Sequence, residues 1–131
     1  MSGDFSTDKN KRRYKMGDIV FKSDEINVME HKHVSKNTGN VMYQQFLLND
    51  EDTGMMIKQI RYPAGGITPW HTHDCAHGMY VLEGILHTNL GDFDEGSFVW
   101  FKEGSKAFHG GKDVDVEVLF ITNKEFNIHY L

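Results

Sequence analysis

The chain has 131 residues, enough for one domain with a buried core and too few for two. Its formal net charge of −5 argues against nucleic-acid binding, which needs clustered Lys and Arg, and no stretch approaches the roughly 18 apolar residues of a membrane span. One cysteine, Cys75, excludes an intrachain disulfide, and the N-terminus has no apolar run typical of a signal peptide. We therefore expect a soluble, cytoplasmic protein that binds neither nucleic acid nor membranes.

The N-terminal part of the chain is predicted to differ from the rest. Residues 1–16 are polar and charged, which indicates a flexible tail, and residues 17–131 are predicted to form a single domain. The basic cluster from Lys9 to Lys15 is interpreted as a solvated end, with a nucleic-acid-binding arm as the alternative. Residues 23–33 are compatible with one or two helical turns or with extended chain.

Short β-prone segments follow at intervals of about ten residues. Val41 to Leu48 is the first, a turn over 49–54 follows, and Met55 to Tyr62 alternates as a strand with one wet face does. The other predicted strands are 77–82, 85–90, 97–101, 114–122 and 127–131, with turns at Glu83-Gly84 and Gly91-Asp92. This spacing predicts an all-β protein, an antiparallel sandwich or barrel.

Four of the eight histidines form a pattern with a physical meaning. His71 and His73 point to the same face of a strand, with Cα atoms about 6.6 Å apart. His77 would lie about 20 Å from His71 on a straight strand, so the chain must bend at Asp74-Cys75-Ala76. His109, from a distant strand, would close the site from the other side. The pattern predicts a metal site of His71, His73, His77 and His109 inside a barrel.

The remaining histidines and the cysteine lack this arrangement. His31 and His33 are interpreted as surface residues and His129 as structural, whereas His87 is either structural or a contact of the pocket. Cys75 lies between two of the predicted ligands. It is either a buried structural thiol, or a redox-sensitive thiol or auxiliary ligand.

The spacing around the first three histidines resembles the first motif of the cupin superfamily. That motif is Gly, five residues, His-x-His, three or four residues, Glu, six residues, Gly. Gly65, His71-Thr72-His73, His77 and Gly84 match every spacing, and His77 stands where Glu is usual. Some cupins have that all-histidine set, including certain metal-dependent oxygenases and a polyketide cyclase.

The second cupin motif is only partly present. Gly96 is in place, Lys102 replaces the usual proline, and His109 comes two residues after the expected histidine. The resemblance covers about residues 55–122. It implies a jelly-roll β-barrel, often a homodimer.

Histidine ligands alone do not select the metal, so one divalent transition metal ion (Fe, Mn, Zn or Ni) is expected. Four neutral ligands leave the ion its full positive charge, which favours an anionic ligand such as an enolate. Six apolar residues near the ligands predict an aromatic cavity for a small organic molecule, if they point inward, or else they only fill the barrel. They are Trp70, Met79, Val81, Phe98, Trp100 and Phe108.

Three functions remain open. The preferred hypothesis is a metal-dependent dioxygenase, an oxidoreductase acting on a small enolisable or aromatic substrate. The second is a non-redox isomerase, lyase or cyclase in which the metal polarises a carbonyl. The third is a cupin that binds a small molecule without catalysis. No spacing singles out an acid/base residue among Asp74, Glu83 and Glu103.

Overall fold

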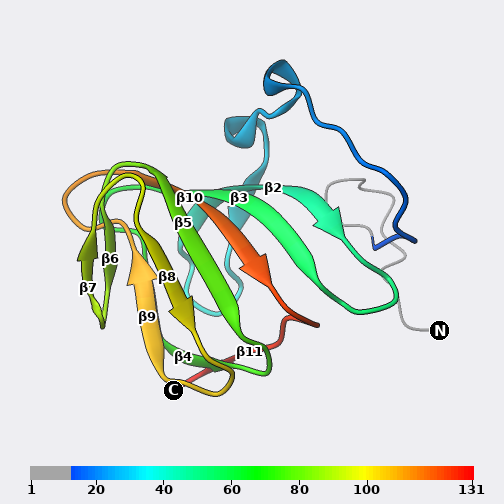
Figure 1. Cartoon of the computed structure of the whole chain (residues 1–131). Helices are drawn as coiled ribbons and strands as arrows, with labels where there is room; N and C mark the ends of the chain where they lie inside the picture. Colours follow the sequence, from blue (N-terminus) through cyan, green and yellow to red (C-terminus); the bar gives the residue numbers. More distant parts are fainter. Residues whose placement is uncertain (1–12) are drawn as a thin grey trace.

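The computed structural model describes residues 13–131, which form two antiparallel β-sheets facing each other (Figure 1). The strands of one sheet are β1 (Lys32–Val34), β2 (Val41–Asn49), β3 (Met56–Tyr62), β5 (His77–Glu83), β8 (Phe98–Phe101) and β10 (Val116–Thr122). Those of the other are β4 (Ile67–His73), β6 (Leu86–Thr88), β7 (Gly91–Phe93), β9 (Ala107–Gly110) and β11 (Ile128–Tyr130).

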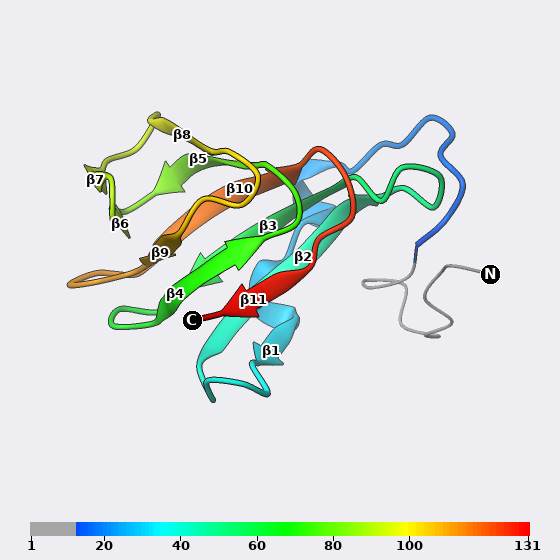
Figure 2. The same ribbon diagram turned by 90° about the horizontal axis from the view of Figure 1, so that it is seen from below.

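The strand order confirms the predicted antiparallel jelly roll. The six-stranded sheet has the order β1-β2-β3-β10-β5-β8, and the five-stranded sheet has the order β11-β4-β9-β6-β7. Figure 2 shows β4 and β11 in front of β3 and β2, so this part of the five-stranded sheet covers the six-stranded sheet. No helix in residues 13–131 has the length and apolar character needed to cross a membrane.

Alternating burial along the central strands explains the core. Every second residue of β3 and of β10 is buried, as expected for strands with one face against the interior. The two sheets pack one continuous apolar cluster between them. Its members are Met56, Ile60, Tyr62, Met79, Val81, Leu86, Val99, Phe101, Ala107, Val116, Val118 and Phe120.

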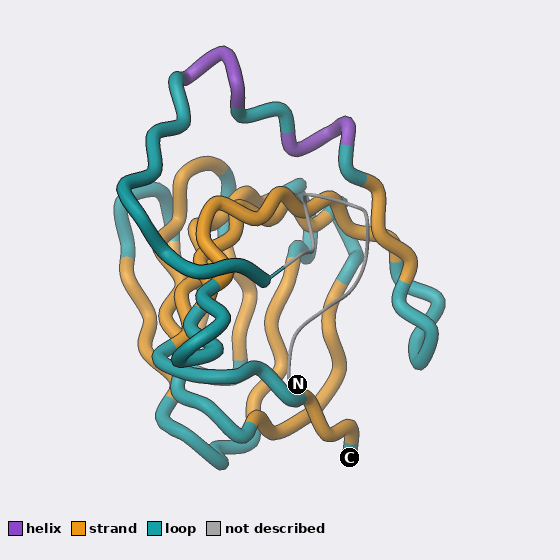
Figure 3. Tube along the Cα trace, turned by 90° about the vertical axis from the view of Figure 1, so that its right-hand side faces the viewer, coloured by secondary structure: helices purple, strands orange, loops and turns teal. Residues whose placement is uncertain are grey.

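Residues 23–33 contain both helical turns and extended chain, the two predicted alternatives. Two short 3₁₀ helices, η1 (Ser23–Glu25) and η2 (Val28–Glu30), are followed directly by extended chain in β1. Figure 3 shows these turns on an arm that lies outside the sheets. Most of the predicted tail, residues 1–12, lies outside the described residues. Of the rest, the backbone of Tyr14 is hydrogen-bonded to Asn49 and Glu51 at the end of β2.

The predicted turn at Gly91-Asp92 is wrong. These residues begin β7, and the turn lies two residues earlier, at Asn89-Leu90. The side chain of Thr88 explains the shift, because its hydroxyl accepts from the Leu90 amide at 3.0 Å and donates to the Gly91 carbonyl at 2.8 Å. The predicted turn at Glu83-Gly84 is confirmed, with Gly84 at φ +82°, where an added Cβ would collide with the Asp115 carbonyl.

Candidate metal centre

The bend predicted between the histidines is confirmed and carries the chain from one sheet to the other. β4 ends at His73, residues 74–76 form no strand, and β5 begins at His77. His71 and His73 therefore belong to the five-stranded sheet, and His77 belongs to the six-stranded sheet. All three side chains are almost fully buried, so each sheet directs its histidines into the interior.

His109 reaches the site from a different direction than the sequence predicts. It lies on β9, the hydrogen-bonded neighbour of β4, and is paired with Thr68. The expectation that His109 closes the site from the other side is therefore wrong, because β4 and β9 are adjacent strands of one sheet. His77 is the residue that faces the site from the opposite sheet.

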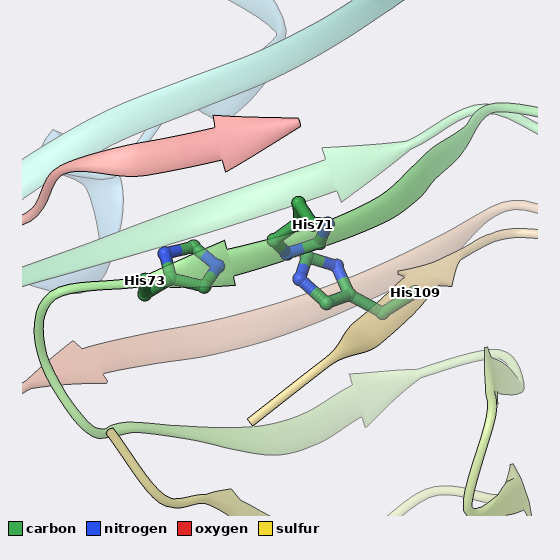
Figure 4. A group of neighbouring side chains, drawn as sticks. All are labelled: His71, His73 and His109. Atoms are coloured by element: carbon green, nitrogen blue, oxygen red, sulfur yellow. The ribbon is translucent and has the colours of Figure 1, made fainter. Parts of the chain in front are cut away.

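Three of the four histidines form a tight group. The ligand nitrogens of His71, His73 and His109 all lie within 4.8 Å of one another, comparable with the span of about 4 Å that two metal–nitrogen bonds cover. Figure 4 shows the rings of His71 and His73 extending from β4 and the ring of His109 extending from β9 toward His71. The ring centres of His71 and His109 are 4.9 Å apart.

His77 lies beside this group. Its ring centre is 4.3 Å from that of His73 and 5.6 Å from that of His109, but its nitrogens are outside the close set of three. Phe101 and Phe120 stack against its ring at 4.9 Å and hold it in place. A four-histidine ligand set stays a prediction, with His77 adjacent to the three residues that meet.

The nitrogens of these residues are unusual because they are buried without partners. Among residues 13–131, every buried side-chain nitrogen or oxygen that lacks a hydrogen bond belongs to one of four histidines. They are Nε2 of His71, both ring nitrogens of His73 and of His77, and Nε2 of His109. Leaving a buried polar group unpaired costs about 1–3 kcal/mol, so a cluster of such atoms calls for a ligand.

Hydrogen bonds on the far side of two rings leave Nε2 available. Nδ1 of His71 lies 2.6 Å from the Pro69 carbonyl, which only accepts, so Nδ1 carries the proton and Nε2 carries the lone pair. Nδ1 of His109 lies 3.4 Å from the hydroxyl oxygen of Tyr62, which can accept from it in the same way. Metal-binding histidines are commonly oriented by such contacts.

The interior keeps these rings uncharged. Burial lowers the pKa of His73 to about 2 and that of His77 to about 3, with the neighbouring histidines adding to the effect. Burial also lowers the pKa of His71, and it lowers that of His109 well below its usual value. Neutral imidazole is the form that binds a metal, so at neutral pH the residues present fit a divalent transition metal ion.

A cavity of about 360 Å³ borders the site, large enough for a small organic molecule. His73 and His109 form part of its wall, together with Tyr62 and Lys58. Of the remaining lining residues, some are apolar or aromatic and others are polar. The apolar and aromatic ones are Met42, Ile60, Phe120, Phe126, Ile128 and Tyr130, and the polar ones are His33, Ser35, Lys36, Asn37, Gln44 and Thr68.

The six apolar residues predicted for this cavity do not line it. Trp70, Phe98 and Trp100 are about half exposed, Phe108 is half-buried, and Met79 and Val81 are buried in the core. Strand parity explains the difference, because Val99 and Phe101 occupy the inward positions of β8 and turn Phe98 and Trp100 outward. The cavity walls come instead from β2, β3, β4, β9, β10, the C-terminal segment, and β1 with the turn after it.

Two polar cavity residues, Lys58 and Tyr62, were not singled out by sequence reasoning. A signal was present, since both share the parity of Met56 and Ile60 on β3 and so belong to its buried face. A lysine at an inward position of an alternating strand is uncommon, because lysine is almost never fully buried unless it is paired.

The histidines outside the pattern have ordinary partners. His87 is hydrogen-bonded to Asp92 at 2.5 Å, which supports its structural interpretation, and the exposed His129 is hydrogen-bonded to Asp74 at 2.9 Å. His33, expected at the surface, is half-buried at the cavity wall. Cys75 is fully buried and burial raises its pKa to about 11, which favours the structural thiol.

The chain matches a known protein family over most of its length. A family profile described as the ChrR cupin-like domain matches residues 25–127, most of the chain. No curated protein sequence matches.

Solved structures share the fold at low sequence identity. The polyketide cyclase RemF from Streptomyces resistomycificus is 15% identical with a TM-score of 0.68, covering 86% of each chain. A cupin-like protein from Thermotoga maritima is 17% identical with a TM-score of 0.63, covering 70% of this chain and 77% of the other. A Nostoc punctiforme protein assigned provisionally as a dioxygenase is 14% identical with a TM-score of 0.62, covering 70% of this chain and 33% of the other. At these identities the likeness shows the fold alone.

Proposed function

This chain belongs to the ChrR cupin-like family, and we propose that it is a metal-dependent dioxygenase acting on a small enolisable or aromatic organic molecule. One observation carries the proposal: neutral, buried imidazoles with unpaired nitrogens lie at the wall of a cavity of about 360 Å³. The dioxygenase assignment of the Nostoc punctiforme neighbour is consistent with it.

The residues of the chain supply binding and orientation. Nε2 of His71 and of His109 would hold the metal ion with one nitrogen of His73, and His77 is the candidate fourth ligand. When bound, the ion supplies a positive charge that stabilises an enolate or phenolate oxygen and, if it is a redox metal, reactivity toward dioxygen.

The surrounding side chains keep the site dry and ordered. The Pro69 carbonyl holds the proton of His71 on Nδ1, so this ring cannot turn over without losing a hydrogen bond. Phe101 and Phe120 cover His77, and Phe126 packs against His73 with ring centres 4.6 Å apart. An apolar surround of this kind strengthens electrostatic interactions with a bound anion.

The test uses the metal-free protein reloaded separately with Fe(II), Mn(II), Ni(II) or Zn(II). Each form is incubated with a panel of 1,3-diketones and phenols, with and without dioxygen, while substrate loss and oxygen uptake are recorded. We expect turnover with a redox metal, with one dioxygen consumed per substrate. Turnover that continues at the same rate without dioxygen contradicts the proposal.

A second function, a non-redox cyclase, isomerase or lyase, has one observation in its favour. A solved polyketide cyclase shares the fold over 86% of both chains. This alternative expects activity with Zn(II) and no oxygen uptake in the same experiment. Binding of a panel compound with no turnover under any metal would indicate a binding module instead.

A further inference from the structure

Lys58 is a cation placed in the interior of the protein. It lies on the inward face of β3 between Met56 and Ile60, and only 8% of its surface is exposed. Its cross-strand neighbours are Phe46 on β2 and Phe120 on β10. The ammonium group is therefore enclosed by the sheet and its aromatic side chains, where a charge is costly to keep.

The contacts around Lys58 satisfy only part of its ammonium group. Nζ donates one hydrogen bond to the side-chain oxygen of Gln44 at 3.0 Å. Three aromatic rings surround it, with Nζ 5.3 Å from the centre of Phe46, 5.1 Å from Phe120 and 5.2 Å from Phe126. An ammonium has three donors, and among residues 13–131 no carboxylate lies within ion-pair distance of this one.

The lysine and the histidines face the same space. Lys58, His73 and His109 all line the cavity of about 360 Å³. The ring of Phe126 contacts both the ammonium of Lys58 and the ring of His73. One end of a small molecule in the cavity can therefore contact Lys58 while its other end contacts the histidines.

The charged side chains that line the cavity are all positive. Its described wall contains no Asp or Glu, and it carries two lysines, the buried Lys58 and the exposed Lys36. Burial lowers the pKa of Lys58 to about 8, so its ammonium form still dominates at neutral pH. Neutral histidine ligands would leave a bound metal ion uncompensated as well. Only a negatively charged ligand would balance this cavity.

We propose that Lys58 anchors an anion subsite and that the cavity binds a small organic acid. The carboxylate of the ligand pairs with the ammonium of Lys58, while a carbonyl or hydroxyl oxygen a few bonds away faces the histidines. The second part rests on the proposed function, whereas the carboxylate subsite stands without it. The aromatic rings of Phe46, Phe120 and Phe126 provide the apolar contact for the body of the ligand.

The experiment measures binding of benzoate and of its neutral analogue benzamide by NMR titration. Both metal-free and metal-loaded protein are titrated, because a bound metal can itself attract a carboxylate. The variants are Lys58→Met, which removes the charge at similar size, and Lys32→Met, which removes an exposed charge on β1 of the same sheet.

We expect metal-free wild type to bind benzoate at millimolar concentration and to bind benzamide about tenfold or more weakly. Lys58→Met should lose that preference, and Lys32→Met should keep it. Equal binding of the two probes by wild type, or undiminished benzoate binding by Lys58→Met, overturns the subsite. The wild-type comparison decides the matter even if Lys58→Met fails to fold.

The same measurements separate this inference from the proposed function. If metal-free protein prefers benzoate through Lys58 but no substrate is turned over with any metal, the subsite stands and the enzyme proposal fails. If wild type and Lys58→Met turn over neutral diketones equally, and wild type binds benzoate no more tightly than benzamide, the enzyme proposal stands and the subsite fails.

Discussion

Histidines occupy two contrasting settings in this protein. His71, His73, His77 and His109 lie in the interior, next to other imidazoles and aromatic rings, with ring nitrogens that have no partner among the described residues. His87 and His129 lie toward the surface, and each is hydrogen-bonded to a carboxylate. The same side chain is therefore prepared as a metal ligand in one region and completes a local polar contact in the other.

The difference shows which environment makes a ligand. Burial keeps the interior rings neutral and leaves several of their nitrogens without hydrogen-bond partners, so binding an ion relieves these unpaired nitrogens together. At the surface, water and the nearby carboxylates of Asp74 and Asp92 already satisfy the rings. Substitutions in the two regions should have correspondingly different effects.

The largest expected effect is on metal binding by the tight group. His71→Ala should weaken the affinity for Zn(II) by more than about 100-fold, because it removes the ligand whose proton position is already set by Pro69. His129→Ala should leave the affinity unchanged. Isothermal titration of metal-free proteins measures both, and equal affinities for the two variants would contradict the contrast between the regions.

A smaller loss is expected from the fourth interior histidine. His77→Ala should weaken Zn(II) affinity by about tenfold, less than His71→Ala, because His77 lies beside the close group rather than within it. Parallel titrations of the two variants test the ranking. A loss as large as that of His71→Ala would make His77 a full ligand and would require its ring to move toward the others.

The contrast also predicts an acid-sensitive stability of the metal-free protein. Because the pKa of His73 is about 2 and that of His77 about 3 in the folded state, only the unfolded chain takes up these protons below about pH 6.5. Stability should therefore fall as the pH drops from about 6.5 to about 3. Urea unfolding at a series of pH values measures the slope.

A matched variant identifies the source of that slope. His77→Gln should flatten the pH dependence because one of the buried groups no longer titrates, and His129→Gln, at the surface, should change it little. A slope that is unaltered in His77→Gln would show that other groups cause the acid sensitivity.

The smallest expected loss of metal affinity comes from removing the contact between Tyr62 and His109. Tyr62→Phe removes the hydroxyl oxygen 3.4 Å from Nδ1 and should weaken metal affinity by about tenfold or less, with little change in fold. Asp74→Asn alters the equivalent contact of the surface residue His129 and should not affect metal binding. Equal metal affinity in Tyr62→Phe and wild type would show that Tyr62 does not orient the ring.

The sequence alone was sufficient for the local features. Alternation and glycine spacing predicted most strands and an antiparallel sandwich or barrel, and the resemblance to cupins implied the jelly roll. The frame from Gly65 to Gly84 predicted three of the interior histidines and the bend at residues 74–76. These features are encoded locally, because strand parity and turn residues depend on a few neighbours in the chain.

The tertiary structure decided everything that depends on which strands become neighbours. It placed β9 beside β4, so that His109 joins His71 and His73 from the same sheet and His77 faces them from the other. It also brought Lys58 to the cavity wall and turned Phe98 and Trp100 away from it. Strand order and sheet packing arise from contacts between segments far apart in the chain, and periodicity within one segment carries no information about them.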